Sequence, residues 1–325
     1  MTPNQRLMIT AVLSVIFFVG YTAIFPPVEP ETKQSNATTQ VEVANGANVS
    51  QSQVDIETGH AVSQKDKVAD IASKNTILTV KNKKFILKMD TLGRISTKEL
   101  LEDKFRDSED RHAQIIPSTG AKPLYVRFLD ETLNQEASTV PYTASISEIT
   151  VSDTAKKVRL TQQLSTLNVT KDITFYADGH YDIEISLSED KRYYVYVGKR
   201  PQVNATEQMM TAKGALVYTD DKQLTILEDG DVEGRKTFTG VELVAAFDQY
   251  TTTMIYGLSK DTNVMIDRDV DDNPVAYFDA LQTMKFSGFV GAKEYKVLHN
   301  IKPVLTNVIE YGWFTFASQP MFLVL

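Results

Sequence analysis

An uncharged stretch near the amino terminus constrains this chain more than any other feature. Residues 7–25, from Leu7 to Phe25, read LMITAVLSVIFFVGYTAIF and contain no charged side chain. At 1.5 Å per residue, a helix of this length spans roughly 30 Å, the thickness of the hydrocarbon core of a bilayer. Arg6 precedes the stretch, whereas Glu29 and Glu31 follow it. The positive-inside rule therefore predicts a cytoplasmic amino terminus, with the rest of the chain outside the cytoplasm.

A cleaved signal peptide is the alternative for this stretch. A signal peptide has an apolar region of about 7–15 residues that ends in small residues of the A-x-A type. This stretch is longer and continues into Pro26 and Pro27. The chain has no cysteine, which excludes a lipid-modified amino-terminal cysteine as well as disulfide bonds. A retained transmembrane signal anchor over residues 1–25 is the favoured interpretation.

Residues 26–74 have the composition of a disordered tether. They are rich in Ser, Thr, Asn, Gln and Pro and contain no aromatic residue. Such a segment buries too little apolar area to offset the conformational entropy lost on ordering. The folded part is therefore predicted to begin near Asn75.

Composition and charge narrow the class of this folded part. The 325 residues, 42% hydrophobic and 23% charged, suit one large or two ordinary globular domains. A net charge of -8 argues against nucleic acid as a partner, because binding to a phosphate backbone requires clustered Lys and Arg.

Alternating apolar and polar residues predict strands throughout the region after residue 75. In residues 181–187 (YDIEISL) the odd positions are apolar and the even ones polar, which is typical of a strand with one buried face. Asp178 and Gly179 supply a hairpin turn between this run and the one that contains Ile173 and Phe175. Similar runs occur at residues 76–80, 84–89, 124–128, 158–164, 193–197, 243–247, 252–256, 275–278 and 283–289. The pattern predicts a mainly β fold, a large antiparallel β-sandwich over residues 75–303.

Helical patterns gather at the carboxyl end. Residues 291–298 (GAKEYKVL) predict a short helix, and residues 304–325 are predicted to form an interfacial helix. The aromatic and apolar residues 308–325 suit the level of the lipid headgroups, although a core helix or strand is the alternative. The predicted membrane-interface residues are Tyr311, Trp313, Phe314, Phe316, Pro320 and Phe322. The apolar ending MFLVL is expected to lead into a further membrane span of a longer protein.

Several motifs resemble one known family. Residues 311–322 (YGWFTFASQPMF) resemble the YGW-x-x-x-x-SQP-[LM]-F stretch that joins the periplasmic domain to the membrane core in YidC-type membrane protein insertases, members of the Oxa insertase superfamily. Residues 78–95 are similar to the first strands of that periplasmic domain, although Leu92 stands where the turn motif T-x-G-G-x-I has its first glycine. Residues 4–6 (NQR) and 247–250 (FDQY) extend the resemblance along the chain.

The resemblance implies a mutarotase-like supersandwich, with an N-terminal transmembrane helix before it and five membrane helices, the insertase core, after it. It implies insertion and folding of inner-membrane proteins in a Gram-negative bacterium, alone or with the Sec translocon. The implied partners are the lipid bilayer, nascent membrane proteins and Sec translocon subunits, and the main domain would be periplasmic. The positive groove residue of the family belongs to the missing helices, so none is nominated here. A membrane-anchored periplasmic carbohydrate-binding sandwich is the alternative function.

The sequence predicts no enzyme active site, cofactor site or metal site. Sugar-converting sandwiches pair a histidine with a carboxylate, and the histidines here are His60, His112, His180 and His299. His180 is expected to be a turn residue and His112 to lie in a solvated, charged loop. Residues 267–273 (DRDVDDN) resemble a calcium loop but lack the glycine and the glutamate of the EF-hand pattern. A solvated turn is predicted there.

Overall fold

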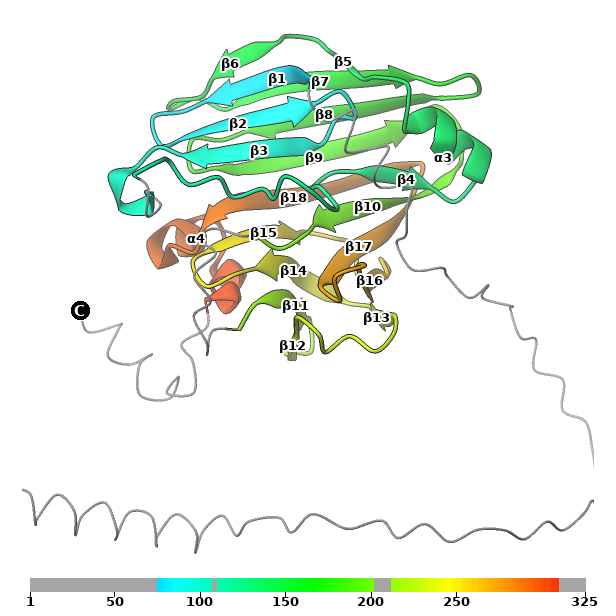
Figure 1. The fold of residues 1–325 in the computed structure, drawn as a ribbon. Helices are drawn as coiled ribbons and strands as arrows, with labels where there is room; N and C mark the ends of the chain where they lie inside the picture. Colours follow the sequence, from blue (N-terminus) through cyan, green and yellow to red (C-terminus); the bar gives the residue numbers. More distant parts are fainter. Residues whose placement is uncertain (1–74, 107–109, 202–211, 310–325) are drawn as a thin grey trace, which may run out of the picture. The chain divides into compact units, whose positions relative to one another are not determined.

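The computed structural model describes residues 75–106, 110–201 and 212–309. These residues form three β-sheets with short helical segments between the strands (Figure 1). Neighbouring strands run antiparallel, with the exception of β1 (Thr76–Lys81) and β6 (Glu148–Thr150), which are parallel. The predicted mainly β fold with large antiparallel sheets is therefore confirmed.

Each sheet mixes strands from distant parts of the sequence. The four-stranded sheet has the order β3 (Ile95–Leu100), β2 (Phe85–Asp90), β1 and β6. The five-stranded sheet has the order β13 (Lys236–Phe238), β16 (Val264–Arg268), β17 (Pro274–Leu281), β10 (Arg192–Gly198) and β4 (Val126–Phe128). The nine-stranded sheet has the order β12 (Leu224–Glu228), β11 (Gly214–Thr219), β14 (Val241–Phe247), β15 (Thr251–Tyr256), β18 (Thr283–Ala292), β9 (His180–Leu187), β8 (Asn168–Phe175), β7 (Lys156–Gln163) and β5 (Thr143–Ala144).

The helical segments are short. They are η1 (Asp103–Phe105), α3 (Glu131–Ala137), α4 (Tyr295–Ile301) and η2 (Pro303–Val308). Helix α3 starts at an N-cap, Asp130, whose carboxylate accepts the backbone N–H of Leu133 at 3.1 Å.

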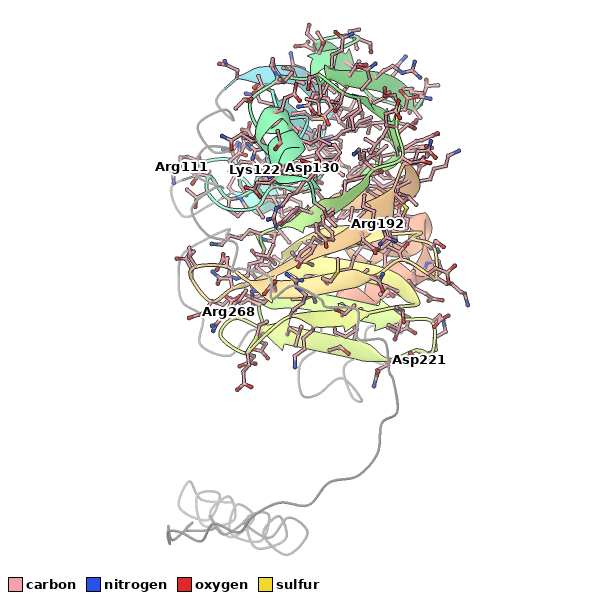
Figure 2. All side chains as sticks on the ribbon, turned by 90° about the vertical axis from the view of Figure 1, so that its right-hand side faces the viewer. Arg111, Lys122, Asp130, Arg192, Asp221 and Arg268 are labelled. Atoms are coloured by element: carbon pink, nitrogen blue, oxygen red, sulfur yellow. The ribbon has the colours of Figure 1, made fainter. Side chains whose placement is uncertain are left out.

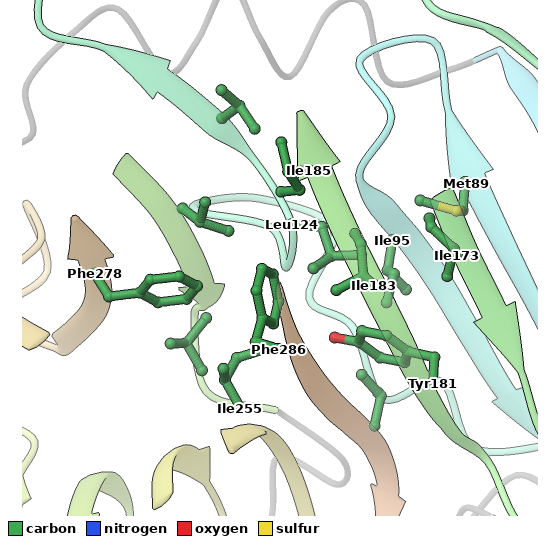
Figure 3. Close-up of a cluster of buried hydrophobic side chains, with 14 of the residues drawn as sticks. Met89, Ile95, Leu124, Ile173, Tyr181, Ile183, Ile185, Ile255, Phe278 and Phe286 are labelled. Carbon is green, nitrogen blue, oxygen red and sulfur yellow. The ribbon is translucent and has the colours of Figure 1, made fainter. Parts of the chain in front are cut away.

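Both smaller sheets pack on the same face of the nine-stranded sheet. Residues opposite each other in a ladder lie on the same face of the sheet. Gly288 of β18 is opposite Tyr181 of β9 on one side and opposite Ile255 of β15 on the other. Tyr181 and Ile255 belong to one hydrophobic cluster with Leu78 of β1 and Phe278 of β17. Figure 3 shows Tyr181, Ile255 and Phe278 in this cluster. The shared core therefore lies between the nine-stranded sheet and the two smaller sheets.

The hairpin of β8 and β9 follows the predicted alternation. Ile183 and Ile185 are buried, whereas Glu184 between them is half-buried. The turn contains Asp178 and Gly179, and Gly179 has a φ of 95° that favours glycine. The Asp178 carboxylate also accepts the backbone N–H of His180. The clearest sequence signal in the chain is thus confirmed.

The turn between β2 and β3 accommodates the leucine that departs from the family motif. The backbone N–H of Leu92 donates to the Asp90 carboxylate at 3.0 Å, and the Leu92 side chain is buried. The positive φ in this turn, 64°, belongs to Gly93, where the motif glycine is retained. Leu92 therefore fills core space without needing a left-handed backbone conformation.

The helix predicted for residues 291–298 starts before the helix that the structure shows, which begins at Tyr295. Gly291 and Ala292 are the last residues of β18, where they pair with Thr252 and Thr251 of β15. Pairing with β15 overrides the local helical pattern for these two residues, because helix propensity is weak compared with the tertiary contacts of a sheet.

Candidate functional site

Helices at the carboxyl end cover part of the second face of the nine-stranded sheet. Leu298 of α4 and Leu305 and Val308 of η2 are fully buried. They form a second hydrophobic cluster with Phe247 of β14 and Met254 of β15. The described chain therefore ends in a layer that is packed firmly on the sheet.

A pocket of about 430 Å³ lies beside the last described residue, and we call it the carboxyl-terminal pocket. It is bounded by the end of β3, η1, the turn between β14 and β15, and the end of β18. The residues that line it are Leu100, Lys104, Phe105, Arg106, Ala113, Gln249, Tyr250, Thr251, Ala292, Lys293, Glu294 and Ile309. The lining residues come from short runs that lie far apart in the sequence, so the sequence offered no signal for the pocket.

Two basic side chains of the carboxyl-terminal pocket pair with acidic neighbours. Lys104 Nζ lies 2.7 Å from the Glu294 carboxylate and 3.4 Å from that of Glu102. The hydrogen bond to Glu294 raises the pKa of Lys104. Arg106 Nε lies 3.0 Å from the Asp103 carboxylate. Both cations are therefore neutralised before any ligand binds.

The predicted membrane-interface residues lie outside the described residues. They are Tyr311, Trp313, Phe314, Phe316, Pro320 and Phe322, and the ends of the predicted transmembrane segment, Leu7 and Phe25, lie outside them as well. These assignments stay predictions. Over residues 75–106, 110–201 and 212–309, no helix is both long and apolar enough to cross a bilayer.

Sequence reasoning missed a buried lysine at the centre of the domain. Charged side chains such as Arg111 and Asp221 lie at the surface (Figure 2), but Lys171 of β8 is fully buried. Its Nζ donates to the carbonyl oxygens of Gly93 and Leu124, each at 2.8 Å. Burial lowers the pKa of Lys171 to about 7. Lys171 thus joins β8 to the turn after β2 and to the segment before β4.

A second buried lysine lies near the β8–β9 turn. Lys98 of β3 is 1% exposed, and its Nζ lies 4.0 Å from the centre of the Phe85 ring. Nζ donates to the Gly179 carbonyl at 3.3 Å. Burial lowers the pKa of Lys98 to about 7, although the Asp178 carboxylate acts in the opposite direction. Both lysines connect separate sheets, which indicates a structural role.

The histidines are dispersed. His180 contacts the Asp178 carboxylate through Nδ1 at the start of β9, as expected for a turn residue. The expectation of a solvated loop is wrong for His112, because its ring is partly buried and its Nδ1 has no hydrogen-bond partner among the described residues. His299 is exposed on α4, and His60 lies outside the described residues. In the part of the chain that the structure describes, no three His, Asp or Glu residues cluster as metal ligands.

The calcium-like segment forms the turn between β16 and β17. The Asp269 carboxylate accepts the backbone N–H groups of Asp271 and Asn273, each at 2.9 Å. Lys199 Nζ lies 2.9 Å from Asp269 and 3.0 Å from Asp271. Asp271 is exposed, as expected of a solvated turn, whereas the Asp269 side chain is only 11% exposed. The ammonium group of Lys199 thus compensates the charge of both carboxylates.

A polar groove of about 350 Å³ occupies the part of the second face that the helices leave open. Its charges are arranged as pairs across neighbouring strands. Asp172 lies 3.1 Å from Lys157 and 2.7 Å from Arg159, and Lys285 lies 3.3 Å from Glu184. The hydrogen bond from Arg159 lowers the pKa of Asp172 to about 2. This surface resembles the solvated face of a sheet.

The fold defines the class of this domain: a large antiparallel β-sandwich with short helices packed at its carboxyl end. Residues 77–324 match the family model of the YidC periplasmic domain. The chain therefore belongs to the YidC periplasmic domain family, as the sequence motifs predicted.

Two relatives are similar to the chain over nearly its whole length, and both are called membrane protein insertase YidC. The protein from Campylobacter jejuni is 33% identical over 325 residues, covering 98% of this chain and 60% of that protein. The protein from Wolinella succinogenes is 33% identical over 325 residues, covering 99% of this chain and 60% of that protein. This chain thus spans about 60% of the length of these relatives.

Solved structures show weaker similarity. The periplasmic domain of the Thermotoga maritima YidC is 13% identical, with a TM-score of 0.36, over 72% of this chain and 96% of that one. A galactose mutarotase related enzyme from Lactobacillus acidophilus is 9% identical, with a TM-score of 0.36, over 65% of this chain and 96% of that one. Scores this low carry no functional information.

Proposed function

We propose that this chain is the membrane anchor and periplasmic domain of a membrane protein insertase. The match of residues 77–324 to the YidC periplasmic domain carries the proposal, and the names of the two relatives support it. The whole protein would insert nascent membrane proteins into the inner membrane of a Gram-negative bacterium. The bilayer, the nascent proteins and Sec translocon subunits are the proposed partners.

Insertion has an energetic cost that this kind of protein lowers. Polar groups moved into hydrocarbon without hydrogen-bond partners cost several kcal/mol each. In this family, the membrane core is the part that lowers the cost of insertion. The periplasmic domain would then act as a scaffold and a docking surface. The relatives' names give no support to the carbohydrate-binding alternative.

We propose the following division of the chain. Residues 1–25 form the transmembrane anchor and residues 26–74 a tether. Residues 75–303 form the periplasmic sandwich, and residues 304–325 lead along the membrane surface to the core of the insertase.

Depletion of the encoded protein in its own host tests the function. After loss of the protein, newly made inner-membrane proteins should fail to insert into the membrane or should insert in the wrong orientation, as protease accessibility shows. Re-expression of the complete reading frame should restore their insertion. Normal insertion after complete depletion in a host without a second insertase would contradict the proposal.

Protease added to spheroplasts tests the orientation and the tether together. We expect cleavage first within residues 26–74, releasing a stable fragment that begins near Asn75, because unpaired polar backbone is cut before packed sheets. The amino termini of the fragments, read by mass spectrometry, give the cleavage sites. Complete protection would place the domain in the cytoplasm, and early cleavage inside residues 77–289 would move the domain boundary.

Trp313 is the single tryptophan of the chain, so its fluorescence reports on the interfacial segment alone. We expect vesicles to shift its emission to the blue, because an indole is stable where its ring is apolar and its N–H reaches water. A matched control carries Trp313→Phe with Leu281→Trp, since Leu281 is 55% exposed on the domain. An equal shift in the control, or none in the parent chain, would refute the interfacial position.

A further inference from the structure

A small pocket lies between the ends of β3 and β18, and we call it the lysine pocket. Its volume is about 80 Å³, which is the room that two or three water molecules take in the liquid. It adjoins the carboxyl-terminal pocket, because Leu100, Phe105, Ala292 and Glu294 line both. Its other walls come from the start of β2, from α4 and from the turn between β8 and β9. A molecule with two or three carbon atoms therefore fits it.

The amino group of Lys98 lies at the wall of the lysine pocket. Its Nζ is 4.0 Å from the centre of the Phe85 ring and 5.7 Å from that of the Phe289 ring. Both rings line the pocket, as do Lys98 itself and Asp178. Nζ also donates to the carbonyl of Gly179, the residue after Asp178, at 3.3 Å. The groups around Nζ are thus the groups that form this pocket.

Lys98 is buried without a counter-ion. It is 1% exposed, and within the described ranges its Nζ forms no ion pair and has the Gly179 carbonyl as its one hydrogen-bond acceptor. Lys199 is buried almost as deeply, at 5%, but its Nζ lies 2.9 Å from the Asp269 carboxylate. Ring faces attract an ammonium group, but with one long hydrogen bond they do not replace the water that it loses. The surroundings of Lys98 therefore favour the neutral amine.

A neutral lysine is a nucleophile at physiological pH. Burial lowers the pKa of Lys98 to about 7, so about half of this amine has a free lone pair at pH 7. Of exposed lysines with the ordinary pKa of about 10.4, roughly one in two thousand is neutral at that pH. Desolvation in an apolar pocket is one way in which proteins prepare a lysine to attack a carbonyl carbon. Lys98 thus combines a free lone pair with space for a small reactant.

We propose that Lys98 is a covalent binding site for small aldehydes, which it captures as an imine in the lysine pocket. The lone pair of Nζ forms the N–C bond while the C=O π bond opens, and a proton moves from nitrogen to oxygen to give a carbinolamine. The C–O bond then breaks, the second N–H proton leaves with the hydroxyl as water, and a C=N bond forms. The Asp178 carboxylate lines the pocket and its side chain is 41% exposed, which suits it to accept these protons and return them.

Competition between lysines of one chain tests the proposal without any substitution. The purified chain in detergent is treated at pH 7 with acetaldehyde and sodium cyanoborohydride, which reduces imines to stable secondary amines. Peptide mass spectrometry gives the rate at each lysine. We expect Lys98 to react at least about tenfold faster than Lys83, which is exposed in the turn between β1 and β2. A rate at Lys98 no higher than that at Lys83 would overturn the proposal.

Lys171 and a larger aldehyde separate the effect of the pocket from that of the low pKa. Burial lowers the pKa of Lys171 to about 7 as well, but Lys171 does not line the lysine pocket, and two hydrogen bonds of 2.8 Å hold its Nζ. We expect Lys171 to stay unmodified. With 2-naphthaldehyde, which is too large for about 80 Å³, the preference for Lys98 over Lys83 should disappear. Equal rates at Lys98 and Lys171, or a preference for Lys98 that persists with 2-naphthaldehyde, would overturn capture in the pocket.

The variant Asp178→Asn tests the proton transfer. Asparagine keeps an oxygen that can accept the His180 N–H but is not a base, so the rate at Lys98 should fall several-fold while the rate at Lys83 stays the same. Loss of the carboxylate also lowers the pKa of Lys98 further, because Asp178 acts to raise it. That change alone would speed the reaction at most about twofold at pH 7. An unchanged or higher rate at Lys98 would therefore overturn the role assigned to Asp178.

The proposal goes beyond the proposed function and does not depend on it. None of these measurements involves insertion, so a negative result at Lys98 is distinguishable from failure of the proposed function. The same reaction on the Lys98→Met variant confirms the assignment of the modified peptide, which should then carry no adduct at residue 98. An undiminished total yield of the fast-reacting adduct in Lys98→Met would place the reactive amine elsewhere and overturn the proposal.

Discussion

Replacing Asp90 with alanine is expected to lower the free energy of unfolding by about 3–5 kcal/mol. The Asp90 carboxylate is fully buried and lies 2.9 Å from the guanidinium of Arg94, which is 2% exposed. It also accepts the backbone N–H of Leu92 at 3.0 Å. The alanine variant keeps the buried cation of Arg94 but removes its carboxylate, and Lys171 loses a nearby negative charge as well. Urea unfolding followed by circular dichroism measures the loss.

An exposed ion pair provides the matched control for Asp90. Lys81 and Glu148 lie 2.8 Å apart with side chains 46% and 55% exposed. Glu148→Ala should therefore cost less than about 1 kcal/mol, because solvent screens an exposed pair. Equal losses for Asp90→Ala and Glu148→Ala would show that burial of the Asp90–Arg94 pair does not control stability.

The stability of the domain is expected to rise between about pH 7.5 and 9.5 because of the buried lysines. Burial lowers the pKa of Lys171 from 10.5 to about 7. Below pH 7 both the folded and the unfolded chain hold the proton, and the folded chain bears the full cost of a buried charge. Between the two pKa values the unfolded chain binds more protons, so the free energy of unfolding increases with pH. The gain from one lysine reaches at most about 5 kcal/mol.

Lys171→Met separates this contribution from the rest. We expect the variant to reduce the pH slope of the unfolding free energy by about 1.4 kcal/mol per pH unit within the window. Lys98→Met should act similarly, since burial also lowers the pKa of Lys98 to about 7. Lys285, 72% exposed, supplies the control, because Lys285→Met should leave the slope unchanged. An unchanged slope in Lys171→Met would mean that the pKa of Lys171 does not differ between the folded and unfolded chains.

Local patterns predicted the strands whose two faces differ in polarity. β9 alternates because one face meets the core and the other meets water, so its signal has period two. β14 was also predicted, from the apolar run at residues 243–247, although it has little polar alternation. The helices cover one of its faces and the five-stranded sheet packs on the other. Strands β3, β5, β6, β11, β12, β13 and β16 and helix α3 were not predicted. Their order and pairing depend on contacts between distant residues, which no local pattern contains.

The functional features were predictable to different degrees. Lys171 had a usable signal, because it shares the buried phase of β8 with Val169 and Ile173. The carboxyl-terminal pocket had none, because its walls come from segments separated by up to about two hundred residues, such as Leu100 and Ile309. The family was predictable because its motifs, such as residues 311–322, are short runs of consecutive residues that the sequence alone displays.

Reconstitution of the complete protein tests the proposed function without the complexity of the cell. The full-length protein that contains this chain would be purified, placed in liposomes and mixed with a newly synthesised single-span membrane protein. Protease protection of the substrate's translocated end measures insertion. We predict that the substrate is protected far more than in protein-free liposomes. This protection should disappear when the bilayer is dissolved with detergent. Protection no higher than in protein-free liposomes, with the protein folded and correctly oriented, would contradict a role as an insertase.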